Sequence, residues 1–221
     1  MSLQEDIAQF SSYFSDRIRE VEKVEPDLFR KILFMGIVDT LSRAGCPGVQ
    51  GHRERVIQFI DNYSGWVDKD RVSAQQLVLN LEEKKKKFSA LHQLAKKKVD
   101  SWPDGSIVRA DADLTFIEAD SVAAVDEKKL VQAATYKHLF YTYRNHLVHE
   151  FREPGYGMEL SQDASTPYYH GMIGDPWQLV FTDQFIKEIC LSCLNGLAGQ
   201  LLTQQKNPYD CYEFGSLWRR K

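Results

Sequence analysis

Arg144, Asn145 and His149 are residues whose types and close spacing could support acid–base chemistry at a phosphate group. A histidine titrates near neutral pH, so His149 can accept or donate a proton. Arginine keeps its charge at every working pH and offers a planar fork of N–H groups to phosphate oxygens. Asn145 lies one helical turn before His149 and can orient its imidazole or donate to the phosphate. Together these groups could assist attack by the 2′-hydroxyl of RNA on the adjacent phosphate.

The three residues lie in segment 136–152, YKHLFYTYRNHLVHEFR, whose apolar spacing predicts one amphipathic helix. On a 3.6-residue wheel, the stripe predicted to face the core contains Tyr136, Leu139, Phe140, Tyr143, Leu147 and Phe151. The stripe on the opposite side is polar and contains His138, Thr142, Asn145, His149 and Arg152. None of these polar residues is acidic, and their side chains are short or form directional hydrogen bonds. We therefore expect this face to contact a partner.

The spacing of Arg144 and His149 favours an assembly of two copies. Residues five apart are separated by about 140° around an α-helix, so one helix presents the two side chains poorly to one phosphate. Two copies that cross at a twofold axis would bring arginine and histidine from both chains into one cleft. We therefore expect a homodimer with this helix at or beside the interface.

Residues Arg144 to His149, RNHLVH, resemble the R-x4-6-H motif of the HEPN superfamily, including the polar residue after the arginine. The resemblance covers the surrounding segment YTYRNHLVHEF most strongly and the N-terminal part of the chain hardly at all. It implies an all-α fold and a metal-independent endoribonuclease that acts as a homodimer and needs no cofactor. It also implies a toxin–antitoxin or defence setting, with RNA as substrate and an antitoxin or another defence protein as a partner.

The same residues allow other interpretations. His149 could be a hydrogen-bonded histidine at a helix contact, and Arg144 could cap a helix or pair with an acidic residue. His138, His146 and Arg152 could bind substrate beside the site or could simply be neighbouring or surface residues. The fold could also persist without cleavage, as a HEPN-like scaffold that binds RNA or protein.

The rest of the chain predicts an all-α protein with an antiparallel helical bundle, which the motif resemblance implies to be HEPN-like. Helical apolar spacing between turn-forming residues predicts helices at residues 3–24, 27–43, 52–63, 73–99, 126–152 and 182–205. Two β-like pieces, 168–172 and 177–181, predict a small hairpin within residues 167–181, directly before the last long helix. Residues 114–117 could add a short strand. We expect one HEPN-like domain over residues 1–221.

The formal net charge of −3 excludes a generally basic nucleic-acid-binding protein, so contacts with RNA would depend on local patches. Two lysine runs, 84–87 and 96–98, could hold phosphates. The glutamates at 82 and 83 favour the simpler interpretation, in which the lysines form a solvated helix face with ion pairs one turn apart.

No stretch of the chain approaches 18 consecutive apolar residues, and the first residues lack a signal-peptide pattern. We therefore expect a cytoplasmic protein that does not enter a membrane. Cys190 and Cys193 form a C-x-x-C pair without a second pair at zinc-ribbon spacing. We interpret them as small buried residues and expect no metal site.

Overall fold

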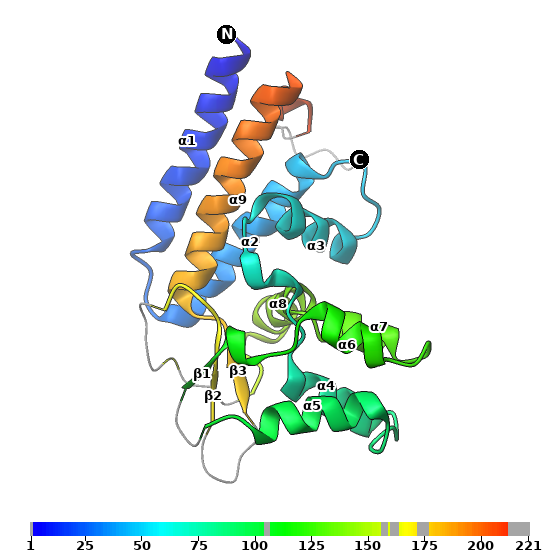
Figure 1. Cartoon of the computed structure of the whole chain (residues 1–221). Coiled ribbons are helices and arrows are strands. Elements are labelled where there is room, and N and C mark those ends of the chain that lie inside the picture. The colour runs from blue at the N-terminus through cyan, green and yellow to red at the C-terminus, as the bar shows by residue number, and fades with distance from the viewer. Residues whose placement is uncertain (1, 104–106, 156–158, 160–163, 172–176, 212–221) are drawn as a thin grey trace. The chain divides into compact units, whose positions relative to one another are not determined.

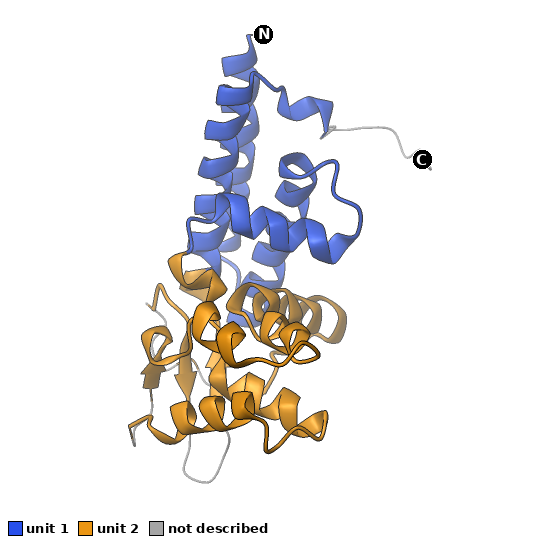
Figure 2. Cartoon of the chain, turned by 45° about the vertical axis from the view of Figure 1, so that its right-hand side comes forward, with its two compact units in different colours: residues 1–66, 186–221 blue, residues 67–185 orange. Residues whose placement is uncertain are grey.

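The computed structural model divides the chain into two compact units, which Figure 2 colours separately. Unit 1 comprises residues 1–66 and 186–221, and unit 2 comprises residues 67–185. The structure describes residues 2–103, 107–155, 159, 164–171 and 177–211. Most of these residues are helical, and the strands among them are only three residues long, which confirms the predicted all-α class. The single HEPN-like domain remains a prediction.

Unit 1 is built from long helices (Figure 1). Its elements are α1 (Leu3–Val21), α2 (Asp27–Gly45), α3 (His52–Tyr63), the 3-10 turn η4 (Pro208–Asp210) and most of α9 (Asp183–Gln204). In Figure 1, α1 and α9 run side by side in opposite directions, as expected for an antiparallel bundle. The helix predicted at about residues 52–63 is confirmed by α3, which begins directly after the glycine-rich stretch.

Apolar side chains of α1, α2 and α9 form the core of unit 1. Phe10 and Phe14 of α1 are buried, with their ring centroids 4.9 Å apart. The Cys190 thiol of α9 donates to the carbonyl oxygen of Phe34 in α2 over 3.4 Å. Cys190 and Cys193 are both fully buried, as predicted, and burial raises the pKa of the Cys193 thiol. A buried thiol of this kind acts as a packing group rather than a nucleophile.

Helix α9 begins where the sequence predicts, because Thr182 caps it by accepting a hydrogen bond from the Phe185 amide over 3.1 Å. Its predicted core stripe is buried at Phe185, Ile189, Leu194, Leu197 and Leu201. Among the described helices, α9 alone has the length and apolar composition that a membrane span requires. A buried core helix meets the same requirement.

Unit 2 combines short helices with a small antiparallel sheet (Figure 1). Its α-helices are α4 (Ala74–Glu83), α5 (Ala90–Asp100), α6 (Phe116–Val122), α7 (Lys128–Ala133) and α8 (Tyr136–Asn145). Its 3-10 turns are η1 (Val67–Asp70) and η2 (Ala110–Ala112), and α8 continues into a π-helical turn, η3 (His146–Glu150). Its strands are β1 (Ile107–Arg109), β2 (Tyr168–His170) and β3 (Gln178–Val180), in the order β1-β2-β3.

The predicted hairpin is confirmed, since β2 pairs antiparallel with β3 and places Tyr169 opposite Leu179. Its connecting residues, 172–176, lie outside the described residues. Strand β1 pairs with the other edge of β2 and was not predicted. The strand expected at 114–117 is wrong, because Thr115 and Glu118 form a capping box that starts α6.

Two predicted helices are interrupted in the structure. The helix expected over 73–99 is capped by Ser73, as predicted, but α4 ends at Glu83 and α5 starts again at Ala90. Lys85 takes a left-handed φ of 57° at this break, and Ser89 caps the second helix. The helix expected over 126–152 is also wrong as a single element. It consists of α7, α8 and the π turn, and α8 begins only at Tyr136.

A buried carboxylate joins three elements of unit 2. Asp113 is 1% exposed, and its Oδ2 accepts hydrogen bonds from the hydroxyls of Tyr136 (2.6 Å) and Tyr169 (2.5 Å). Its Oδ1 accepts from the backbone amide of Ala74 over 2.8 Å. The first residues of α8 and α4 and the middle of β2 therefore converge on one side chain. Burial raises the pKa of Asp113 to about 6, although the two tyrosine hydroxyls oppose this shift.

The raised pKa predicts a pH-dependent contribution of Asp113 to stability. The folded chain retains a proton on Asp113 at pH values where the unfolded chain has lost it, so this contribution is largest below the unfolded pKa. It should fall by about 2 kcal/mol as the pH rises from 4 to 7, because one pKa unit corresponds to about 1.4 kcal/mol and part of the shift lies below pH 4. Urea denaturation across this range should show the unfolding free energy of the wild type falling by this amount relative to that of Asp113→Asn.

The exposed Asp111, on the neighbouring turn, provides a matched control. Asp111→Asn should keep the pH profile of the wild type. A difference between wild type and Asp113→Asn that stays constant from pH 4 to 7 would contradict the assignment.

Candidate active site

Helix α8 is fixed by the buried face that the sequence predicted. Tyr136, Phe140, Tyr143 and Leu147 are each at most 2% exposed. The ring of Phe140 meets the ring of Phe181 edge-on, with centroids 5.5 Å apart, and the Tyr143 ring meets Phe181 at 5.3 Å. These contacts set the rotation of α8 and so the direction in which its polar residues point.

The helix changes its winding directly after Asn145. Residues 146–150 form a π-helical turn, which closes at Phe151 with a left-handed φ of 53°. The Phe151 amide donates to the carbonyl of His146, five residues earlier, as a π turn requires. The side chain of Phe151 is 64% exposed, so its predicted place in the core stripe is wrong. The wider turn and the left-handed residue move it off the buried face.

The π turn brings Arg144 and His149 together within one chain. Arg144 Nη1 lies 3.0 Å from His149 Nε2. The sequence-based expectation that a single helix separates these side chains is therefore wrong. It assumed α-helical winding throughout, whereas in a π turn residues five apart lie one above the other.

The contact with Arg144 determines which ring nitrogen of the His149 imidazole carries the hydrogen. A guanidinium only donates, so His149 Nε2 is the acceptor in this contact and Nδ1 carries the hydrogen. Arg144 Nη1 also donates to Asn145 Oδ1 over 3.2 Å. Asn145 therefore acts on His149 through the arginine rather than directly. Arg144 is 8% exposed, whereas His149 is an exposed side chain.

His146 and Arg152 share an acidic partner at the end of the turn. Nδ1 of His146 lies 3.0 Å from Glu150 Oε1, and Arg152 Nη2 lies 2.6 Å from Glu150 Oε2. The close contacts with His146, and then with Arg152, lower the pKa of the Glu150 carboxyl. Glu150, which the motif does not single out, therefore reduces the positive charge that Arg152 could offer to a phosphate.

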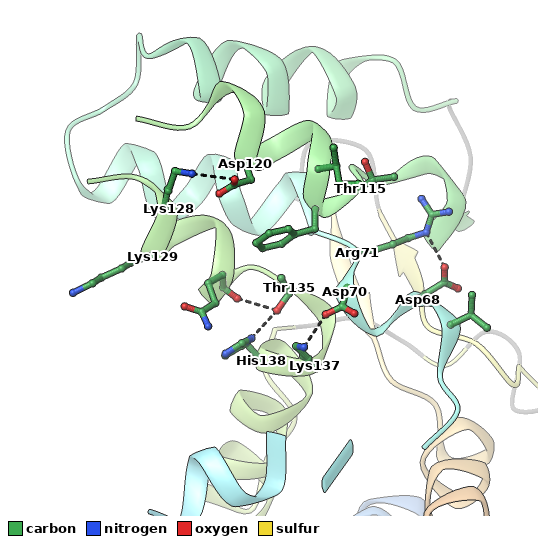
Figure 3. Close-up of a pocket in the computed structure, with 14 residues that line it drawn as sticks. Asp68, Asp70, Arg71, Thr115, Asp120, Lys128, Lys129, Thr135, Lys137 and His138 are labelled. Carbon is green, nitrogen blue, oxygen red and sulfur yellow. Dashed lines mark hydrogen bonds and ion pairs between the residues drawn. The ribbon is translucent and has the colours of Figure 1, made fainter. Parts of the chain in front are cut away.

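His138 lies at a different hollow of unit 2 (Figure 3). It is 7% exposed, and its Nδ1 lies 2.7 Å from Thr135 Oγ1. The hollow has a volume of about 860 Å³, and its walls come from η1, α6, α7 and the start of α8. Three ion pairs line it: Lys128–Asp120 (3.0 Å), Lys137–Asp70 (2.8 Å) and Arg71–Asp68 (2.7 Å). A substrate contact by His138 would therefore belong to this charged hollow and not to the Arg144–His149 contact.

No protein-family model, curated protein or solved structure matches this chain. The resemblance to HEPN proteins therefore rests on the motif residues alone. Within the described residues, no group of three or more His, Cys, Asp or Glu side chains is placed to hold a metal ion.

The geometry predicts a large loss of stability for one substitution and a small loss for a neighbouring one. Leu147→Ala should lower the free energy of unfolding by about 2–5 kcal/mol, because it empties a fully buried position. His149→Ala should lower it by less than about 1 kcal/mol, because the side chain is exposed and loses one hydrogen bond. Urea denaturation would measure both values, and a larger loss for His149→Ala would show that His149 is mainly structural.

Proposed function

We propose that this chain is a metal-independent endoribonuclease of HEPN type that acts as a homodimer. The observation that carries the proposal is the 3.0 Å contact between Arg144 Nη1 and Nε2 of the exposed His149. It puts a fixed positive charge beside an imidazole that can accept or donate a proton. The motif resemblance adds a toxin–antitoxin or defence setting in the cytoplasm, with an antitoxin or another defence protein as a partner.

In the proposed reaction, His149 Nε2 carries the lone pair that takes up a proton. When a phosphate replaces it as the acceptor for Arg144, Nε2 can accept the proton of the RNA 2′-hydroxyl. The 2′-oxygen then bonds to phosphorus while the bond from phosphorus to the 5′-oxygen breaks. The products are a 2′,3′-cyclic phosphate and a 5′-hydroxyl end. Arg144 offsets the negative charge that builds up on the phosphate oxygens.

The leaving 5′-oxygen needs a proton from the opposite side of the phosphorus. In an in-line displacement the entering and leaving oxygens face away from each other, so one imidazole serves both poorly. A second His149, from the other copy of a homodimer, can supply this proton. This requirement gives the proposed homodimer a chemical reason beyond the motif resemblance.

The alternative function is a HEPN-like scaffold that binds RNA or protein without cleavage. The observation in its favour is that Arg144 is largely buried and already donates to His149 and Asn145. Such a network could serve only to fix the end of α8. Cleavage assays on purified protein separate the two functions.

We expect His149→Ala and Arg144→Ala each to reduce RNA cleavage by roughly 10²-fold or more, since acid–base help and one charge-stabilising contact each contribute about that much. Arg144→Lys should cleave faster than Arg144→Ala but more slowly than the wild type, because lysine keeps the positive charge but lacks the planar fork of N–H donors. Gel analysis of a labelled RNA would measure the rates. Cleavage should persist in EDTA, and DNA, which lacks the 2′-hydroxyl, should remain intact.

His52→Ala serves as the matched control, because His52 is a histidine of α3 in the other unit, 3.3 Å from Asp39. It should cleave at the wild-type rate. Equal cleavage with and without His149, or cleavage only with added divalent metal, would refute the proposed mechanism. Absence of any cleavage, with a range of RNAs, would favour the scaffold.

A mixing experiment tests whether the Arg144–His149 pair works within one chain. Heterodimers of Arg144→Ala and His149→Ala subunits, co-expressed with different tags, contain no chain with both residues. The reference is the heterodimer of a wild-type subunit with an Arg144→Ala/His149→Ala double-variant subunit, which also holds one arginine and one histidine, but in the same chain. If the in-chain contact is required, the mixed heterodimers should cleave more slowly than this reference. Light scattering first establishes the dimer, and differently tagged wild-type chains are the positive control. Recovery of substantial activity would show that arginine and histidine act across the interface.

A further inference from the structure

A second hollow of unit 2, with a volume of about 440 Å³, adjoins the helix that carries the proposed catalytic residues. Its walls come from α4, α8, the first residue of the π turn and strand β3. The volume lies within the range of small-molecule pockets, towards its lower end. We call this hollow the amide pocket, after the side chains Gln75, Gln76, Asn80 and Gln178 that line it.

The amide pocket differs from the larger hollow in its charge. Among the described residues that line it there is no aspartate, glutamate, lysine or arginine. Its polar groups are amides, hydroxyls and the imidazole of His146, and Trp177 adds a large aromatic surface. The larger hollow, in contrast, contains three ion pairs. A neutral ligand that is flat and forms directional hydrogen bonds suits such a lining, whereas a phosphate or a carboxylate does not.

The pocket also has a fixed relation to the catalytic helix. Leu139, Thr142, Tyr143 and His146 line it at the i, i+3, i+4, i+7 spacing of one helix face. His146 belongs to the same π turn as His149. A ligand in the pocket and a phosphate at His149 would therefore contact adjacent faces of one short segment.

We propose that the amide pocket binds one unpaired nucleobase of the RNA whose phosphate is cleaved at His149, an inference that rests on the proposed function. Side-chain amides recognise the donor and acceptor groups on base edges, and aromatic rings stack on base faces. The base is neutral, so it can enter an uncharged pocket while its phosphate remains beside Arg144.

The Gln76–Asn80 pair gives the pocket a defined pattern of hydrogen-bonding groups. Gln76 Nε2 donates to Asn80 Oδ1 over 2.9 Å, one helical turn away on α4. This bond orients the two amides, so that the Gln76 oxygen can accept from a base and the Asn80 amino group can donate to one. An acceptor beside a donor is the arrangement with which amides read base edges.

Binding of labelled RNA octamers to the full-length His149→Ala protein tests the inference without cleavage. The probes are the four homopolymeric octamers and an octamer of abasic ribose phosphates. At least one base should bind roughly tenfold or more tightly than the abasic octamer, because stacking and edge contacts add to the phosphate contacts. In this background, Trp177→Ala should remove that advantage and leave binding of the abasic octamer unchanged.

Asn80→Asp is a second variant that preserves the shape of the side chain. Aspartate still accepts from Gln76, but it replaces the amino group with an oxygen and adds a negative charge. Asn80→Asp should therefore abolish base selectivity, that is, the tighter binding of a base octamer than of the abasic octamer. This variant keeps the test possible if Trp177→Ala fails to fold. Gln93→Ala, which changes an exposed amide on α5, is the matched control and should bind like the parent protein.

The inference is overturned if all five octamers bind alike, or if base selectivity survives in both Asn80→Asp and Trp177→Ala. Cleavage that depends on His149 but shows no base preference would also overturn it, while the proposed function would stand. Base-selective binding lost in Asn80→Asp, together with no cleavage by the wild type, would support the pocket and count against the ribonuclease.

Discussion

The buried carboxylate of Asp113 is the interaction on which the arrangement of unit 2 depends. A carboxylate away from water is costly unless donors surround it, so its oxygens hold the hydroxyls of Tyr136 and Tyr169 and the amide of Ala74 in place. These donors begin α8, lie in β2 and begin α4. Helix α8, which carries the candidate catalytic residues, and helix α4, which lines the amide pocket, are therefore both held by this one side chain.

The candidate site shows why helical periodicity alone could not place its residues. The buried stripe at Tyr136, Phe140, Tyr143 and Leu147 was predictable, because tertiary packing preserves an apolar face. The contact between Arg144 and His149 was not, because it depends on one turn of wider winding. A helical wheel drawn at 3.6 residues per turn cannot represent such a turn. The residue types drew attention to the pair, but the local backbone determined that Arg144 and His149 meet within one chain.

The same limit applies to the fold. Helices with clear end signals were predictable, such as α3 after its glycines and α9 after Thr182. The break between α4 and α5 was missed because Phe88 fits the apolar spacing of a continuous helix, although it is 86% exposed. Strand β1 pairs with β2 about sixty residues later in the chain, and such long-range pairing has no local sequence signal.

The charges around the candidate site explain why base contacts matter for the proposed activity. A protein with a net charge of −3 gains little from general attraction to RNA, and Glu150 offsets Arg152 and faces His146. Arg144 then contributes an arginine charge directly at His149. Binding that cannot come from many phosphate contacts has to come from stacking and hydrogen bonding to bases. An uncharged pocket beside a single arginine is the arrangement that this constraint favours.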